Sequence, residues 1–226
     1  MLVYISEMPT PTQRRSYDGS GRRARAQANR ERILATALGL FVVQGYAGTS
    51  IADIAAAAGV SVPTVFAHFG SKVELFKHCV DSATVGDAKP VPLADRPEMI
   101  NVREGRTARQ VIGRLAALIA SAGPRVVPIY MVMYGAADAD PEIRSLARTM
   151  DDQRLIGAAQ LAHVIVDRLD TDNDDLAAEI RDLIWTLNSP KTFSLLITER
   201  GWPLDRYEAW IRRTLLATTT GRKSSN

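Results

Sequence analysis

Residues 50–69 constrain the fold more than any other part of the chain, because they encode two short helices joined by a glycine. Ser50 can accept a hydrogen bond from a free backbone N–H, and Asp53 completes a capping box, which predicts that a helix begins here. Gly59 predicts where this helix ends, since glycine adopts positive φ without steric cost. Between these limits, apolar residues recur at three- and four-residue spacing, as one narrow buried face requires: Ile51, Ile54, Ala55 and Ala58.

A second helix is expected at about 62–69. Ser61 can cap it, and Pro63 lies in its first turn, where a missing backbone N–H costs nothing. Val65 and Phe69 are four residues apart and predict its inward face. Two capped helices separated by a glycine are typical of a helix-turn-helix, whose second helix enters the major groove of DNA.

A third helix is expected to begin at Lys72, after a break at Gly70 and a cap at Ser71. A lysine at a helix N-terminus is unfavourable for the helix dipole unless an anion such as a phosphate also binds there. Similar hairpins occur in proteins that never bind nucleic acid. Nucleic-acid binding is favoured here because residues 30–43 form a helix that could pack against the hairpin through one apolar stripe: Ile33, Leu34, Ala37, Leu40 and Phe41.

The stretches ERILATALGLFVVQGYAGTSIADIAAAAGVS and TVFAHFGSKVELF resemble the DNA-binding domain of the TetR family of bacterial transcriptional regulators. The resemblance covers residues 27–85. It implies DNA contacts to phosphates and base edges from eight positions: Thr49, Ser50, Ser61, Pro63, Thr64, Phe66, His68 and Lys72.

Two of these positions depart from the family pattern. Phe66 stands where a tyrosine usually donates to a phosphate, so that hydroxyl contact is lost or is replaced by packing on a sugar or a thymine methyl. Pro63 stands where the family often has glycine or another small residue. It stiffens the start of the helix and should alter which bases are contacted.

The chain is expected to be all-α, with an N-terminal three-helix domain and a larger helical ligand-binding and dimerisation domain. The expected divisions are a disordered arginine-rich arm (1–26), the helix-turn-helix domain (27–85), the regulatory domain (86–218) and a disordered tail (219–226). A proline-rich loop should occupy residues 86–98. Helices are expected at about 103–122, 126–136, 141–169, 176–188, 191–200 and 204–217.

The N-terminal arm is strongly basic. Seven arginines lie between Gln13 and Arg32, against only Asp18 and Glu31. The arm could follow the DNA backbone or minor groove, as such arms do in other helix-turn-helix proteins. It could equally be a solvated tail, or result from a start codon upstream of a true start at Met8.

The regulatory domain has one candidate pocket, suggested by the VPIYMVMYG run, where thioethers and phenol rings suit a partly apolar ligand. The predicted pocket residues are Tyr130, Met133, Tyr134, His163 and Trp185. Methionine and tyrosine at helical spacing are more often core residues, so that alternative stays open. The resemblance also implies a homodimer, for which five residues could form the interface or the domain's own core: Trp185, Leu187, Phe193, Leu196 and Trp210.

Several classes of function are not supported. No GxSxG, HExxH, GxGxxG or P-loop pattern is present, so we expect no enzyme, no catalytic residue and no cofactor. Cys79 is the single cysteine and His68 has no ligand partner at suitable spacing, so no metal site is expected. The apolar stretch 115–137 contains Arg125 near its middle, and we interpret it as buried helix rather than a membrane span.

The function implied by the resemblance is a homodimeric repressor that a small, partly apolar effector releases from a palindromic operator in double-stranded DNA. The alternative is an inducer-independent activator or an architectural DNA-binding protein. Either would act in the bacterial cytoplasm at the nucleoid, since no signal peptide is evident.

Overall fold

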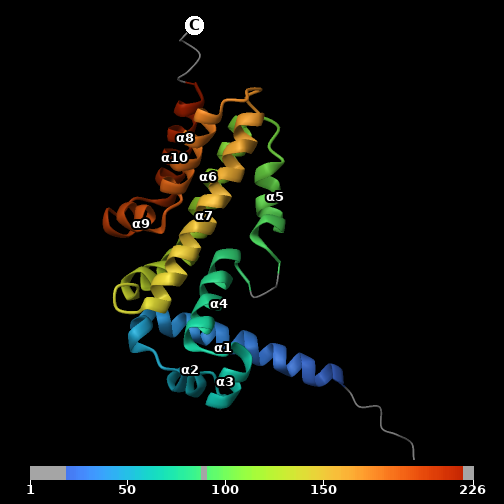
Figure 1. Ribbon diagram of the computed structural model, residues 1–226, viewed down its shortest axis with the longest axis vertical. Helices are drawn as coiled ribbons and strands as arrows, with labels where there is room; N and C mark the ends of the chain where they lie inside the picture. The colour runs from blue at the N-terminus through green and yellow to red at the C-terminus, as the bar shows by residue number, and fades with distance from the viewer. Residues whose placement is uncertain (1–18, 88–90, 221–226) are drawn as a thin grey trace, which may run out of the picture.

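The computed structural model describes residues 19–87 and 91–220, and within these ranges it contains helices and no strand. Two long helices, α6 (Ala108–Ala136) and α7 (Pro141–Asp167), run along the length of the molecule (Figure 1). The N-terminal helices lie at one end of this pair, and the C-terminal helices lie along its other half. The predicted all-α class, with an N-terminal helix-turn-helix, is confirmed.

The N-terminal unit consists of α1 (Gly19–Gly48), α2 (Ile51–Ala57), α3 (Val62–Phe69) and α4 (Lys72–Val85). Ser50 and Asp53 form the predicted capping box at the start of α2. Gly59 has φ +63°, as expected of the glycine that ends this helix. Ser61 accepts a hydrogen bond from the backbone N–H of Thr64 at the start of α3. These local signals therefore place each boundary of the hairpin.

The first helix is longer than predicted. Helix α1 begins at Gly19, so residues 19–26 of the predicted disordered arm are helical. The arginine-rich sequence contains no proline between positions 19 and 48, and arginine and alanine are good helix formers. The prediction for residues 1–18 falls outside the described residues. Near the other end, Gly45 has φ +76° and introduces a kink.

The second half of the chain begins with a short 3-10 turn, η1 (Leu93–Asp95), and helix α5 (Pro97–Arg103). After α6 and α7 come α8 (Asp174–Leu187), α9 (Pro190–Phe193), a π-helical segment η2 (Ser194–Glu199) and α10 (Leu204–Thr220). The predicted disordered tail is wrong for residues 219 and 220, which belong to α10, and its remaining residues, 221–226, fall outside the described residues.

Two predictions for this half were wrong. Helix α5 begins at Pro97, inside the expected loop, because proline is well suited to the first turn of a helix. Helix α6 continues through Pro124, in the break expected between residues 122 and 126, and also through Pro128. Each proline removes a backbone donor, but the neighbouring residues Ala120, Gly123 and Val127 are buried, and this packing keeps the helix continuous.

Buried apolar side chains form two clusters. One joins α6, α7, α8 and α10 around residues such as Ile112, Ile165 and Tyr207. The other joins α1–α4 to the second half of α6 and the first half of α7. Ile129, Met133 and Ile143 belong to this second cluster. The hydrophobic core therefore does not divide near residue 85, where a domain boundary was predicted, because the N-terminal core continues into α6 and α7.

Helix α6 also has the length and hydropathy of a membrane-spanning helix. Its apolar side chains lie in both clusters and contact other helices, among them α1, α4, α7 and α10. The core helix of a globular domain has the same composition, and the observed packing favours that interpretation.

Candidate functional site

The helix-turn-helix is held by short polar contacts at its helix ends. The Ser50 backbone N–H and hydroxyl donate to Asp53 Oδ2 at 3.0 and 2.6 Å, and these hydrogen bonds lower the pKa of the Asp53 carboxyl. The Ser61 and Thr64 hydroxyl oxygens are 2.7 Å apart at the start of α3. Arg32 Nε of α1 donates to the Ala58 carbonyl at the end of α2, 2.8 Å away. These contacts orient α2 and α3 relative to α1.

Helix α3 presents one buried face and one exposed face. Val65 and Phe69 point into the N-terminal core, as predicted. Phe66 is 47 % exposed and is the one aromatic side chain among the large exposed apolar residues of α2 to α4. Pro63 is exposed, while Thr64 and His68 are half-buried. The predicted base-edge residues therefore lie on or beside the outer face of α3.

Thr49 does not lie on this surface. Its side chain is completely buried, and its hydroxyl donates to the Gly45 carbonyl at 2.8 Å and to the Leu40 carbonyl at 3.3 Å. These bonds fasten the end of α1 to the start of α2. The expectation that the Thr49 side chain contacts phosphate is thereby corrected, and Ser50, which is exposed, is the remaining candidate at this helix end.

Lys72 lies at the start of α4, where Ser71 accepts a hydrogen bond from the Glu74 backbone N–H at 3.1 Å. The Lys72 ammonium sits 4.2 Å from the centre of the Tyr46 ring. Burial of its stem lowers the pKa of Lys72, and nearby Asp140 opposes that shift. The Tyr46 ring packs against Phe41 and Phe76. The aromatic core therefore positions the lysine through a cation–π contact.

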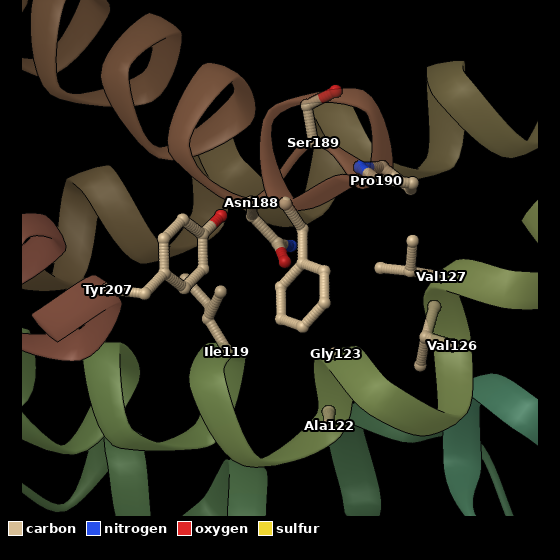
Figure 2. Close-up of a pocket in the computed structure, with 10 residues that line it drawn as sticks. Ile119, Ala122, Gly123, Val126, Val127, Asn188, Ser189, Pro190 and Tyr207 are labelled. Carbon is tan, nitrogen blue, oxygen red and sulfur yellow. The ribbon is translucent and has the colours of Figure 1, made fainter. Parts of the chain in front are cut away.

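A pocket lies between α6, the α8–α9 junction and α10 (Figure 2). The cavity itself is small, with a volume of about 40 Å³, and it is open to solvent on one side. Tyr207 and Ile119 lie at one end and Val126 and Val127 at the other. The complete lining is Ile119, Ala122, Gly123, Val126, Val127, Asn188, Ser189, Pro190, Phe193 and Tyr207. The wall is thus mainly apolar, with amide and hydroxyl groups along one side.

Phe193 packs directly on Gly123 in this pocket. A Cβ atom built on Gly123 would lie 2.0 Å from the phenylalanine ring, so α6 admits the ring only because position 123 is glycine. The ring also meets Tyr207 edge-on, with 5.3 Å between centroids. The Tyr207 hydroxyl donates to the Leu187 carbonyl at 2.6 Å.

None of the five predicted pocket residues lines this cavity. Tyr130 and Met133 are buried in the cluster shared with the N-terminal helices. His163 is exposed on α7. The residues that do line it escaped prediction because they come from three separate segments. Ser189 and Pro190 fall between the helices expected at 176–188 and 191–200, and the glycine at position 123 within an apolar helix is the one signal of close packing.

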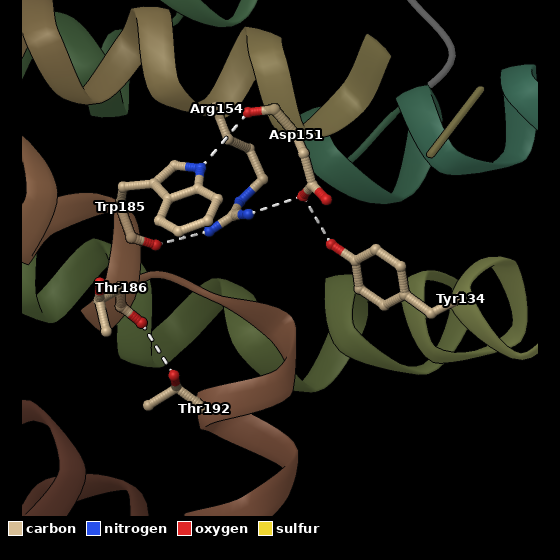
Figure 3. A network of polar contacts seen from close by, with 6 residues as sticks. All are labelled: Tyr134, Asp151, Arg154, Trp185, Thr186 and Thr192. Atoms are coloured by element: carbon tan, nitrogen blue, oxygen red, sulfur yellow. Dashed lines mark hydrogen bonds and ion pairs between the residues drawn. The ribbon is translucent and has the colours of Figure 1, made fainter. Parts of the chain in front are cut away.

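Tyr134 and Trp185, also predicted for the pocket, belong instead to a polar network that joins α6, α7 and α8 (Figure 3). The Tyr134 hydroxyl donates to Asp151 Oδ1 at 2.7 Å, and Arg154 Nη1 donates to the same oxygen at 2.9 Å. Arg154 Nη2 donates to the Trp185 carbonyl at 2.8 Å. Burial and the bond to Asp151 raise the pKa of Tyr134. The Trp185 indole N–H donates to the Asp151 carbonyl at 3.4 Å, so the Tyr134 and Trp185 side chains both connect neighbouring helices.

The five residues predicted for either the dimer interface or the core differ in their burial. Leu187 and Phe193 are buried within the chain's own core. Leu196 and Trp210 are partly buried against that core, whereas Trp185 is 38 % exposed. Only part of this set is therefore available to a partner.

Among residues 19–87 and 91–220, no group of three or more His, Cys, Asp or Glu side chains could hold a metal ion. Cys79 is buried, and burial raises the pKa of its thiol to about 12. It is a structural residue in this environment.

Comparison with known proteins agrees with this geometry. Residues 33–79 match the model of the bacterial regulatory proteins of the tetR family. The chain is 32 % identical over 114 residues to the HTH-type transcriptional regulator TcmR of Streptomyces glaucescens. That alignment covers 49 % of this chain and 49 % of TcmR, so it spans about half of each protein.

Solved structures share the fold over most of the chain. A tetR-family transcriptional regulator from Streptomyces coelicolor superposes with a TM-score of 0.59 at 20 % identity, covering 85 % of this chain and 80 % of that one. A transcriptional regulator from Saccharomonospora viridis, solved in complex with choline, gives a TM-score of 0.60 at 23 % identity and covers 84 % and 96 %.

The fold and the hairpin together define an all-helical protein with an N-terminal helix-turn-helix and a helical C-terminal domain that contains a pocket. Over residues 33–79, the N-terminal helix-turn-helix domain is therefore similar to that of the bacterial regulatory proteins of the tetR family.

Proposed function

We propose that the chain is a transcriptional regulator that binds double-stranded DNA through α3 and the start of α4. The observation that carries this proposal is the capped hairpin itself, with an exposed α3 face and a lysine held at the N-terminus of α4. Exposed backbone donors and an ammonium at one helix end suit a phosphate. Ser50, at the start of α2, offers a second exposed helix end.

Binding as a homodimer follows from the physics of recognition, because one short helix gives weak binding and a two-fold dimer reads two half-sites. Helices α8 and α10 lie side by side on the outer part of the C-terminal half (Figure 1). They carry exposed apolar side chains at Trp185 and Leu204, which support an interface there. Such a dimer would place two copies of α3 on one palindromic operator in the cytoplasm.

Repression relieved by a small molecule is the form of regulation that the pocket supports best. Its apolar walls and its amide and hydroxyl groups suit a small, partly apolar effector. The regulator from Saccharomonospora viridis, which has a similar fold, was solved in complex with choline, and this supports the proposal of a small-molecule effector.

Hydrogen bonds connect the part of α6 that lines this pocket to the C-terminal end of α4. Arg125 lies on the same turn of α6 as the pocket residues Ala122 and Val126. Its guanidinium donates to the Ala83 carbonyl at 2.6 Å and to the Thr84 carbonyl at 3.3 Å, in the last turn of α4. Helix α4 begins at Lys72. A ligand that displaces this part of α6 would therefore displace α4 and change the spacing of the two α3 helices.

The DNA interface is tested by measuring affinity for several duplexes across a range of salt concentrations. Lys72→Ala should weaken binding to all sequences about equally and reduce the slope of log K against log salt by about one per subunit. Thr64→Ala should instead change which sequence is preferred. Unchanged affinity of Lys72→Ala at physiological salt would remove the phosphate contact from the proposal.

The regulatory site is tested with compounds that dissociate the wild-type protein from its operator. Val127→Phe narrows the pocket and should abolish release while operator affinity is retained. A compound that releases the wild type and Val127→Phe at equal concentrations would act at another site.

A further inference from the structure

The composition of α3 restricts what its exposed face can recognise. In the major groove, guanine is read by arginine or lysine, adenine by asparagine or glutamine, and cytosine by a carboxylate. Residues 62–69 contain none of these side chains. A helix that reads DNA from this face therefore lacks the common bidentate hydrogen bonds to three of the four bases.

The exposed face is apolar instead. At about 100° per residue, Pro63 and Ala67 lie opposite the buried Val65 and Phe69. Both outer residues are exposed. Phe66, beside them, is 47 % exposed. The side of α3 that would meet a base pair thus presents a pyrrolidine ring, a methyl group and a phenyl ring.

The hydroxyl groups at the start of α3 are already engaged with each other. Ser61 Oγ and Thr64 Oγ1 lie 2.7 Å apart, and Ser61 Oγ also accepts from the Thr64 backbone N–H at 3.3 Å. A bond to a base would compete with this cap. Because the Thr64 hydroxyl is engaged in this cap, we expect the Thr64 methyl group, rather than the hydroxyl, to contact DNA.

We infer that α3 reads thymine through its C5-methyl group, with Phe66 as the main contact and Pro63 and Ala67 beside it. The methyl is the apolar group on the major-groove edges of the four bases, and apolar side chains recognise it by contact. This inference rests on the proposed function and specifies the half-site: thymines, and hence A·T pairs, at the positions that face α3.

The size of the effect follows from the burial of one methyl group. Removing a buried methyl weakens an interaction by about fourfold, and the symmetric removal of one methyl from each half-site weakens it by about fifteenfold. Uracil is the suitable probe, because it pairs as thymine does and lacks only the C5-methyl.

The test uses the full-length protein and a duplex that it has selected from a random pool. Each thymine is replaced by uracil in turn, symmetrically in both half-sites, and affinity is measured. Substitution at the positions facing α3 should weaken binding by about fifteenfold. Uracil outside the half-sites should leave affinity unchanged.

Phe66→Ala identifies the side chain responsible. Phe66 is largely outside the core, so its removal should leave the fold intact. The variant should bind the thymine duplex more weakly and lose most of the difference between thymine and uracil. Val43→Ala is the matched control, since Val43 is 83 % exposed in the same domain but lies on α1. It should retain the full thymine-to-uracil ratio.

The outcomes separate this inference from the proposed function. Equal affinity for thymine and uracil duplexes would overturn the inference while specific DNA binding stands. A selected half-site without A·T pairs would do the same. Phe66→Ala with an unchanged thymine-to-uracil ratio would remove Phe66 from the contact. Failure to select any sequence would instead count against the proposed function itself.

Discussion

The helix-turn-helix and the pocket are stabilised in different ways. Helices α2 and α3 have 7 and 8 residues, too few to be stable alone, and each depends on a capping serine and a few buried side chains. Helices α6 and α7 have 29 and 27 residues and depend on long apolar faces packed against several other helices. The DNA-facing geometry is therefore determined by neighbours in sequence, whereas the pocket is assembled from distant segments.

The largest effect is expected where these two regions share a core. Met133 is completely buried on α6, in the cluster that includes α1–α4. Met133→Ala should lower the free energy of unfolding by about 2–5 kcal/mol, because a buried side chain is lost and a cavity remains. Urea denaturation measures this loss.

The same variant tests whether the regions are coupled. Amide hydrogen exchange in α1 and α4 should become faster in Met133→Ala, although the substitution lies in α6. Unchanged exchange in these helices would mean that the hairpin domain is stable independently of α6.

A smaller effect is expected at the contact of Gly123 with Phe193. Gly123→Ala should destabilise the protein by about 1–3 kcal/mol, because the new methyl group would overlap the phenylalanine ring and force it to move. Gly113→Ala is the matched control on the same helix, since a Cβ there meets nothing within 4 Å.

The control should be neutral or stabilising by up to about 1 kcal/mol, as expected for glycine to alanine in a helix. Thermal unfolding of both variants gives the comparison. Equal stabilities would show that Phe193 does not pack against α6 in solution.

A local effect is expected at the hairpin. Ser50→Ala removes both the side-chain acceptor for the Asp53 backbone N–H and the hydroxyl that donates to the Asp53 carboxylate. The loss should be about 1 kcal/mol and should appear as faster hydrogen exchange in α2. Ser50→Thr keeps the cap and should retain most of the protection. Equal exchange in the two variants would contradict a stabilising role for the capping box.

The smallest effect is expected from thiol reagents. Burial raises the pKa of Cys79 to about 12, so the thiol remains protonated at pH 8 and is inaccessible. Alkylation should be slow in the native protein and fast in urea. Rapid alkylation of the folded protein would instead show that the Cys79 thiol is accessible and reactive.

The difference between local caps and contacts between distant segments explains which features could be predicted from sequence. Ser50, Gly59 and Ser61 act on backbone groups within three or four residues, so their spacing was enough to locate α2 and α3. The continuity of α6 through Pro124 depends on helices that pack around it and could not be inferred locally.

The pocket could not be predicted for the same reason. Gly123, Asn188 and Tyr207 meet only after folding, and no short motif joins them. Tyr134 was selected for its chemistry, but its hydroxyl is engaged by Asp151 in the network between helices. Thr49 shows a second limit of prediction from sequence. It lies within a recognisable motif, but the motif does not reveal that the Thr49 side chain is buried.

The most direct test of DNA recognition by this hairpin is selection of duplexes from a random pool by the purified full-length protein. We predict enrichment of an inverted repeat whose half-sites lie about one helical turn, or a small multiple of it, apart, as two copies of α3 in a two-fold dimer require. Retention of duplexes without any enriched sequence would contradict specific recognition and favour an architectural DNA-binding protein held by charge.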